Sequence, residues 1–325
     1  MSYKSGVRSA IRAEIILWNE GCYVKKAMFI LNPGSGRQDF WADVEAVIGC
    51  LILNEIVNHV DVFYTQKKYD ARKAAARLKY GQYDVVVAVG GDGTVSDVIN
   101  GILAGKSRIP VAVLPEGTSN AFAHALDLPS DKEDFCRMLK AFNTVDIDVG
   151  RLNGEYFIST VAGGMGADIS YKAASDTKAI FGRKAYFFEG LRSFPKQWFK
   201  SHRLYFDSHE FTAKTNTMMF YISNAGGIAG NKRLFKDGTM NDGVLNVAAF
   251  QKMNPLQFAI AFSRFLQGKP VNHAKVKLFR TKKLRIKSLD DASIPINADG
   301  EMSGMLPIEV ECVPKAVRIV IPDRT

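Results

Sequence analysis

Apolar runs in the first half of the chain alternate with segments of helical periodicity. The strand-like runs are at 26–33, 61–65, 84–89 and 109–115. The helical patterns are at 40–56, at 70–80, after Gly93, and at 119–126. This alternation is typical of βαβ units that build a parallel sheet. Ligands of such open sheets bind beyond the carboxyl ends of the strands, where glycine-bearing segments stand at 32–37, 90–94 and 116–120.

The pattern changes after Gly150 to short alternating strands separated by turn signals. Asn153-Gly154 predicts a hairpin, and a helical pattern at 255–266 interrupts the strands. This half therefore reads as antiparallel. The last strand, at 316–321, could return to either half. We predict an α/β N-terminal domain with a parallel sheet at 25–150, to which 308–325 returns, and a C-terminal antiparallel domain at 151–307.

Length and cysteine content restrict the protein class. With 325 residues, 47% of them hydrophobic, the chain is long enough for two globular domains. Its four cysteines form no CxxC pair, which argues against a zinc site and a disulfide scaffold and favours reduced thiols. The apolar run at 15–18 is too short for a signal peptide or a membrane span. We expect a soluble intracellular protein in which residues 1–23 are an extension or a start-site artefact.

The formal net charge of +10 implies an acidic partner. Between Lys172 and Arg203 there are eight Lys or Arg residues, two acidic residues and many aromatic rings. This mixture suits an anionic membrane surface, although a basic solvated face over an aromatic core explains it equally well. A second basic run at 275–287 is interpreted as strand residues with their charges outward.

The segment from Val85 to Asn100 carries the clearest chemistry. An apolar strand enters Gly90-Gly91-Asp92-Gly93-Thr94, and helix-patterned residues follow. Glycines let backbone N–H groups approach a phosphate, and Thr94 or Ser96 is expected to start a helix whose N-terminus favours negative charge. Because Asp92 would repel phosphate, its carboxylate is expected to act through Mg²⁺. A tight structural turn is the alternative, and neither the dinucleotide fingerprint nor the P-loop pattern fits.

These segments together resemble the diacylglycerol kinase catalytic family, which includes bacterial soluble lipid kinases and sphingosine kinases. The resemblance runs from about Lys26 to the C-terminus. Its landmarks, in chain order, are NPGSG at 32–36, GGDGTVSDVINGI at 90–102, PEGTSNAFAHAL at 115–126, DVG at 148–150, NDG at 241–243 and DGE at 299–301.

The resemblance implies an ATP-binding domain shaped like those of NAD kinase and phosphofructokinase, followed by a β-sandwich domain. It also implies a water-mediated link from Asp92 to Asp148 and catalytic Mg²⁺. The implied nucleotide-binding residues are Asn32, Pro33, Gly34, Ser35, Gly36, Thr65, Gly90, Gly91, Asp92, Gly93, Thr94, Glu116, Gly117, Thr118 and Asn120.

A metal loop is implied in the second half. There the side chain of Asp242 and the carbonyls of Thr239 and Val244 would hold a structural Mg²⁺, an ion that prefers oxygen ligands. A hairpin turn is the alternative interpretation of this segment.

The DGE triplet is where similar enzymes place the carboxylate that receives the proton of the lipid hydroxyl. We expect Glu301 to be this acceptor, with Asp299 as the second candidate, while a turn with solvated acids is the alternative. In phosphoryl transfer, positioning and Mg²⁺ carry most of the work. His124, on an apolar helix, is interpreted as a packing residue.

The sequence therefore predicts a cytoplasmic, ATP- and Mg²⁺-dependent lipid kinase that associates peripherally with the inner membrane surface. Diacylglycerol, giving phosphatidic acid, is the leading substrate. Ala121 stands where many diacylglycerol-phosphorylating members have an acidic residue, so a sphingoid base, monoacylglycerol or undecaprenol stays open as the lipid substrate. A soluble NAD kinase-like enzyme and a non-catalytic lipid or nucleotide sensor are the rivals. No motif supports nucleic-acid binding, and homodimer formation is left open.

Overall fold

The computed structural model describes residues 24–35, 40–165, 200–225, 239–269, 271 and 273–323. Predictions for residues 1–23, for Gly36 and for nearly all of the basic aromatic segment lie outside these residues. The chain forms two compact units. Unit 1 comprises the described residues up to Val149, the segment Thr239–Asp242 and the chain from Val313 onward. Unit 2 comprises the described residues of Gly150–Gly238 and Gly243–Cys312.

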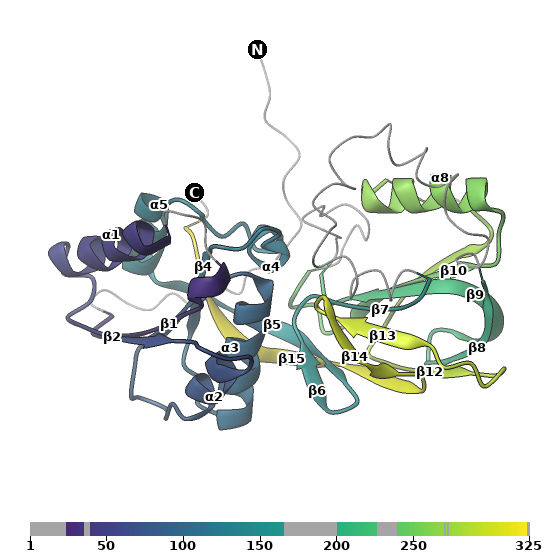
Figure 1. The fold of residues 1–325 in the computed structure, drawn as a ribbon, viewed down its shortest axis with the longest axis horizontal. Coiled ribbons are helices and arrows are strands. Elements are labelled where there is room, and N and C mark those ends of the chain that lie inside the picture. Colours follow the sequence, from purple (N-terminus) through teal and green to yellow (C-terminus); the bar gives the residue numbers. More distant parts are fainter. Residues whose placement is uncertain are drawn as a thin grey trace, which may run out of the picture. The chain divides into compact units, whose positions relative to one another are not determined.

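Unit 1 contains a parallel sheet. Its strands run in the order β2-β1-β3-β4, followed by the C-terminal part of β15 (Figure 1). Their bounds are β1 (Lys26–Leu31), β2 (His59–Tyr64), β3 (Val85–Gly90), β4 (Val111–Pro115) and β15 (Ile308–Ile321). All residues of β3 and β4 are buried, as expected for central parallel strands covered on both faces.

Helices lie on both faces of this sheet (Figure 1). α1 (Phe40–Leu53) packs beside α5 (Lys132–Ala141), and α2 (Asp70–Ala76) packs against α3 (Asp92–Gly105). A Cβ on Gly101 would lie 2.4 Å from the carbonyl oxygen of Arg72, so the approach of α3 to α2 requires glycine.

Several helix bounds differ from the prediction. α2 ends at Ala76 rather than at residue 80, because the N–H groups of Arg77 and Leu78 donate to carbonyls only three residues back (both 3.2 Å), which closes the last turn. α4 (Ala121–Ala125) begins after the left-handed Asn120 (φ 47°) rather than at Ser119. α5 was not predicted, although Asp131 provides an N-cap by accepting a hydrogen bond from the N–H of Asp134.

Unit 2 is antiparallel. β9 (Thr212–Ser223) pairs with β7 (Thr160–Gly164), β8 (His202–Asp207) and β10 (Leu245–Gln251). β10 also pairs with β11 (Val276–Thr281), β8 pairs with β12 (Lys283–Ser288), and β7 pairs with β13 (Pro295–Ala298), which in turn pairs with β14 (Glu301–Met305). Parallel and antiparallel halves are therefore confirmed.

The predicted hairpin at Asn153-Gly154 is also confirmed. It joins β5 (Asn143–Leu152) to β6 (Glu155–Phe157), and both turn residues have positive φ, 48° and 98°. This geometry is typical of two-residue hairpin turns. α8 (Pro255–Leu266) is the helix predicted at 255–266.

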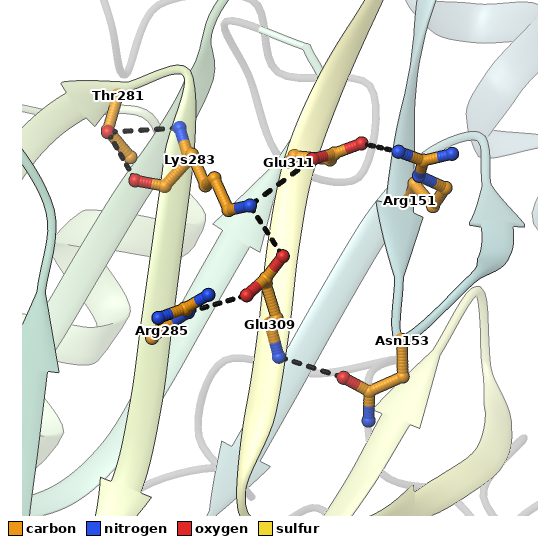
Figure 2. A network of polar contacts seen from close by, with 7 residues as sticks. All are labelled: Arg151, Asn153, Thr281, Lys283, Arg285, Glu309 and Glu311. Carbon is orange, nitrogen blue, oxygen red and sulfur yellow. Dashed lines mark hydrogen bonds and ion pairs between the residues drawn. The ribbon is translucent and has the colours of Figure 1, made fainter.

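The predicted outward charges hold for β12, where Lys283 and Arg285 are exposed while Leu284 and Ile286 are buried. Figure 2 shows the surface network that these charges form with β15. The Lys283 Nζ lies 2.6 Å from Glu309, and the Arg285 Nε lies 2.5 Å from the same carboxylate. Lys283 also lies 3.8 Å from Glu311, which pairs with Arg151 as well. β11 departs from the pattern, since Leu278 is 38% exposed.

Two further findings bear on protein class. Within the described ranges, no helix has the length and apolar character needed to cross a bilayer. Cys50, Cys136 and Cys312 are free thiols, and the remaining cysteine, Cys22, lies outside the described chain.

Candidate active site

The carboxyl ends of four adjacent strands lie at one edge of the unit 1 sheet. β2, β1, β3 and β4 are parallel neighbours, so the loops that follow them begin side by side. Backbone hydrogen bonds continue past the strands: Thr65 donates to the carbonyl of Leu31 (2.9 Å), and Glu116 donates to that of Gly90 (3.0 Å). The predicted nucleotide-binding residues that the structure describes therefore gather along this edge.

Asn32 links the first of these loops to α3. Its Nδ2 donates to the Oγ1 of Thr94 (3.2 Å), and its Oδ1 accepts from the N–H of Gly34 (3.1 Å). Pro33, Gly34 and Ser35 form a single 3-10 turn. Asn32 thus links the loop after β1 to the first turn of α3, because its amide nitrogen bonds to α3 and its amide oxygen bonds within the loop.

Two glycines allow the loops after β3 and β4 to touch. A Cβ on Gly117 would lie 2.5 Å from the Cα of Gly91 and 2.7 Å from the Oδ1 of Asn120. Asn120 closes the second loop, because its side chain accepts from the N–H of Gly117 and donates to the Gly117 carbonyl, both at 2.9 Å. Thr118, in the middle of this loop, is exposed. Any side chain on Gly117 would separate the two loops.

α3 begins at this edge of the sheet, and its N-cap residue makes no side-chain hydrogen bond to the N–H groups of the first turn. The helix begins at Asp92 with Gly91 as N-cap, so the expectation that Thr94 or Ser96 starts it is wrong. Gly91 has the extended backbone typical of an N-cap residue (φ −87°, ψ −176°), so Asp92 is the first helical residue. Gly93 is exposed in the first turn. A 14-residue helix that begins this way favours an anion at its N-terminus.

Asp92 has a contact that the sequence did not predict. Its two carboxylate oxygens accept hydrogen bonds from the N–H groups of Ala121 (3.1 Å) and Phe122 (3.0 Å). The carboxylate therefore positions the start of α4. Each of its oxygens has a second lone pair, so these contacts leave it able to take part in cation binding.

Asp148 is a buried carboxylate, 1% exposed, on β5. Its Oδ1 accepts from the N–H of Lys315 (2.8 Å), and its own N–H donates to the carbonyl of Met240 (2.6 Å). Within the described part of the chain, no group of three or more His, Cys, Asp or Glu side chains could hold a metal ion. Mg²⁺ needs no such group, because it is usually held by one or two carboxylates with substrate phosphates and water. Asp92 and Asp148 are the two carboxylates that the sequence predicts for this ion.

The predicted metal loop forms a turn. The Oδ2 of Asp242 accepts a hydrogen bond from the N–H of Thr239 (2.8 Å), three residues earlier in the chain, so this carboxylate closes the turn. Val244 directly precedes β10. Asp237 and Gly238 of the same sequence motif lie outside the described residues.

Asp299 and Gly300 form the two-residue turn of the β13–β14 hairpin, with φ of 49° and 89°. Asp299 is not a solvated acid. It accepts from three backbone N–H groups, those of Ile158 (2.7 Å), Ser159 (2.8 Å) and Thr160 (2.9 Å). Glu301, the first residue of β14, is exposed. The structure therefore separates the two candidate acids by environment.

Two further residues are placed in a way that the sequence did not predict. Tyr221 lies near Asp299. Burial raises the pKa of its phenol and the negative charge of Asp299 raises that pKa further, so the phenol stays protonated. No motif or periodic pattern in the sequence marks this partly buried tyrosine. His124 is exposed rather than packed, because Phe122 and Ala123 are the residues of α4 that face the core.

Comparison with known proteins gives two family matches. The model of the diacylglycerol kinase catalytic domain matches residues 26–152. The model of the YegS C-terminal NAD kinase beta sandwich-like domain matches residues 159–321. A diacylglycerol kinase of Staphylococcus aureus strain RF122 is 29% identical over 299 residues, covering 92% of this chain and 93% of that protein. The enzyme of strain MRSA252 matches equally well.

Solved structures show the same fold. A diacylglycerol kinase from Bacillus anthracis superposes with a TM-score of 0.72 at 16% identity, covering 93% of this chain and 98% of that one. Yeast NADH kinase in complex with NADH superposes with a TM-score of 0.55 at 12% identity, covering 98% and 91%. The predicted fold class and the predicted family are confirmed. The chain belongs to the diacylglycerol kinase catalytic family of lipid phosphotransferases, with a YegS-type sandwich-like second domain.

Proposed function

We propose that the protein transfers the γ-phosphoryl group of ATP to a lipid hydroxyl, and that diacylglycerol, giving phosphatidic acid, is its principal substrate. The observation that carries the proposal is the edge of the unit 1 sheet, where glycine-bearing loops surround an uncapped helix N-terminus. Diacylglycerol is favoured as the substrate because the relative in Staphylococcus aureus that aligns with 92% of this chain is named a diacylglycerol kinase.

The strand-end loops would bind the nucleotide. The N–H groups at the start of α3 are donors for its phosphates, and the glycines at 91, 93 and 117 keep that surface clear of side chains. Asn32 and Thr94 would fix the loop that covers the same helix end. When bound, Mg²⁺ would neutralise charge that develops between the phosphates, and Asp92 and Asp148 are the residues that would hold it.

Glu301 is the better candidate for receiving the proton of the lipid hydroxyl. It is exposed, whereas the carboxylate of Asp299 is engaged by three backbone donors. Hydrogen bonds to a carboxylate favour its charged form and make it a weaker base. We assign Asp299 the positioning of the β13–β14 turn, which carries Glu301. Thr239, Asp242 and Val244 remain candidates for a structural Mg²⁺.

A soluble substrate of the NAD kinase kind is the second candidate, because yeast NADH kinase shares the fold. The match to the diacylglycerol kinase catalytic domain favours a lipid. A protein that acts on a lipid must reach it at a membrane surface, and the net charge of +10 suits an anionic one.

The reaction is tested by incubating the full chain with Mg²⁺, diacylglycerol in mixed micelles and ATP labelled at either the α- or the γ-phosphate. We expect label in lipid from γ-labelled ATP alone. Asp92→Asn should abolish transfer. Label from the α-position, or full activity of Asp92→Asn, would contradict the proposed chemistry.

A further inference from the structure

α8 has two apolar faces, and among the described residues only the inner one belongs to a core cluster. On its inner face, Phe258, Ala261 and Phe265 join a core cluster with residues of β9 and β10, and the helix lies across those strands (Figure 1). The ring centroids of Phe250 and Phe265 are 5.2 Å apart. On the outer face, Leu256 and Ile260 are 66% and 48% exposed. They are one turn apart and therefore neighbours on the helix surface.

The exposure of this pair does not come from a poorly anchored helix. A capping box begins α8: the N–H of Gln257 donates to the Oδ1 of Asn254 (2.8 Å), and the N–H of Asn254 donates to the Oε1 of Gln257 (3.3 Å). Pro255 occupies the first turn, where its missing N–H costs nothing. The outer face is thus presented by a helix that is fixed at its start and packed along its inner side.

The sequence segment that contains the pair is basic. The 47 residues from Gly243 to Leu289 contain ten Lys or Arg and no Asp or Glu. Of these, Lys283 and Arg285 are paired with acids of β15. Lys252, which precedes α8 in the sequence, and Lys269, which follows it, are both exposed. Within the helix, the exposed Arg264 lies one turn after Ile260. The exposed Leu278 lies on the same face of β11 as Val276, a member of the cluster under α8.

We propose that the outer face of α8 docks on an anionic bilayer, with Leu256 and Ile260 entering the boundary between headgroups and acyl chains. Lys252, Arg264 and Lys269 would lie at the level of the lipid phosphates. A helix with an exposed apolar pair, in a sequence segment that is rich in basic residues and contains no acid, has the composition that favours an anionic interface. The choice of a lipid surface rests on the proposed function, because the substrate would be in that surface.

The test is sedimentation of the full chain with vesicles, without ATP or diacylglycerol. Phosphatidylglycerol mixed with phosphatidylcholine is compared with phosphatidylcholine alone. We expect binding to the anionic vesicles that weakens with salt, and binding at least about ten-fold weaker for Leu256→Ser/Ile260→Ser, because two apolar side chains no longer leave water. Ile52→Ser/Leu53→Ser is the matched control, since these residues of α1 are 49% and 85% exposed; it should bind like the wild type.

Unchanged binding by the α8 variant, equal binding to both vesicle types, or loss of binding by the control as well would overturn the docking proposal. Thermal unfolding of each variant establishes that it folds. Transfer to a short-chain diacylglycerol dissolved as monomers separates the two proposals. An active α8 variant that binds vesicles normally refutes docking alone, whereas a wild type that binds vesicles but phosphorylates no lipid refutes the proposed function alone.

Discussion

Gly93→Ala separates nucleotide binding from stability. A Cβ at this position would meet no atom within 4 Å, and Gly93 does not have a positive φ. Because it is the second residue of α3, alanine should raise the free energy of unfolding by up to about 1 kcal/mol. The same methyl group would stand at the helix N-terminus that we assign to phosphate. We expect ATP affinity to fall at least about ten-fold, which corresponds to about 1.4 kcal/mol.

The assay for this prediction is calorimetric titration with ATP and Mg²⁺, accompanied by urea unfolding of the same preparations. The expected result is a variant that is as stable as the wild type or more stable and that binds ATP weakly. Wild-type affinity for ATP in a fully folded variant would refute the assignment of the α3 N-terminus to phosphate.

Gly117→Ala provides the contrast. Its Cβ would lie 2.5 Å from a backbone atom of Gly91, and backbone cannot rotate away as a side chain can. Overpacking of this kind costs about 1–3 kcal/mol. We expect both the free energy of unfolding and ATP affinity to fall. A normal unfolding midpoint would show that the two loops are not held in contact.

Three further substitutions test the second unit. Asp299→Asn should lower the free energy of unfolding by about 2 kcal/mol, since one amide oxygen replaces a carboxylate that accepts three backbone N–H groups; an unchanged urea midpoint would contradict this. Glu301→Gln should keep that midpoint and lower kcat about 100-fold, and a normal kcat in the labelled-ATP assay would exclude it as the proton acceptor. Lys283 and Arg285 lower the pKa of Glu309, so its stabilising contribution is present at neutral pH and disappears as the pH falls below about 4.5 through the folded-state value. Glu309→Gln should therefore unfold with a smaller difference between pH 7 and pH 3 than the wild type, and an equal difference would show that the pairs contribute nothing.

The parallel and antiparallel halves could be predicted because each has a strong local signal. Alternation of strands and helices is visible before Asp148, and Asn-Gly and Asp-Gly turns are visible after it. Helix ends were less predictable, because they depend on single backbone conformations such as the left-handed Asn120. α5 was missed although its N-cap Asp131 and its apolar spacing are present in the sequence.

At the candidate site, the sequence indicated which residues matter but not how they meet. The glycines at 91 and 117 are 26 positions apart, and their contact depends on the adjacency of β3 and β4. The bonds from Asp92 to the start of α4 and from Asp299 to the N–H groups at 158–160 likewise join distant segments. Side-chain to backbone contacts of this kind leave no periodic signal, so only the fold could reveal them.

The most direct test of the central claim is transfer of labelled γ-phosphate from ATP, with Mg²⁺, into a panel of acceptors. The panel contains diacylglycerol, monoacylglycerol, sphingosine and undecaprenol in mixed micelles, with NAD as the soluble acceptor. If the protein is a lipid kinase that acts on diacylglycerol, we expect label in phosphatidic acid and none in NADP. Label in NADP alone, or in no acceptor, would contradict it.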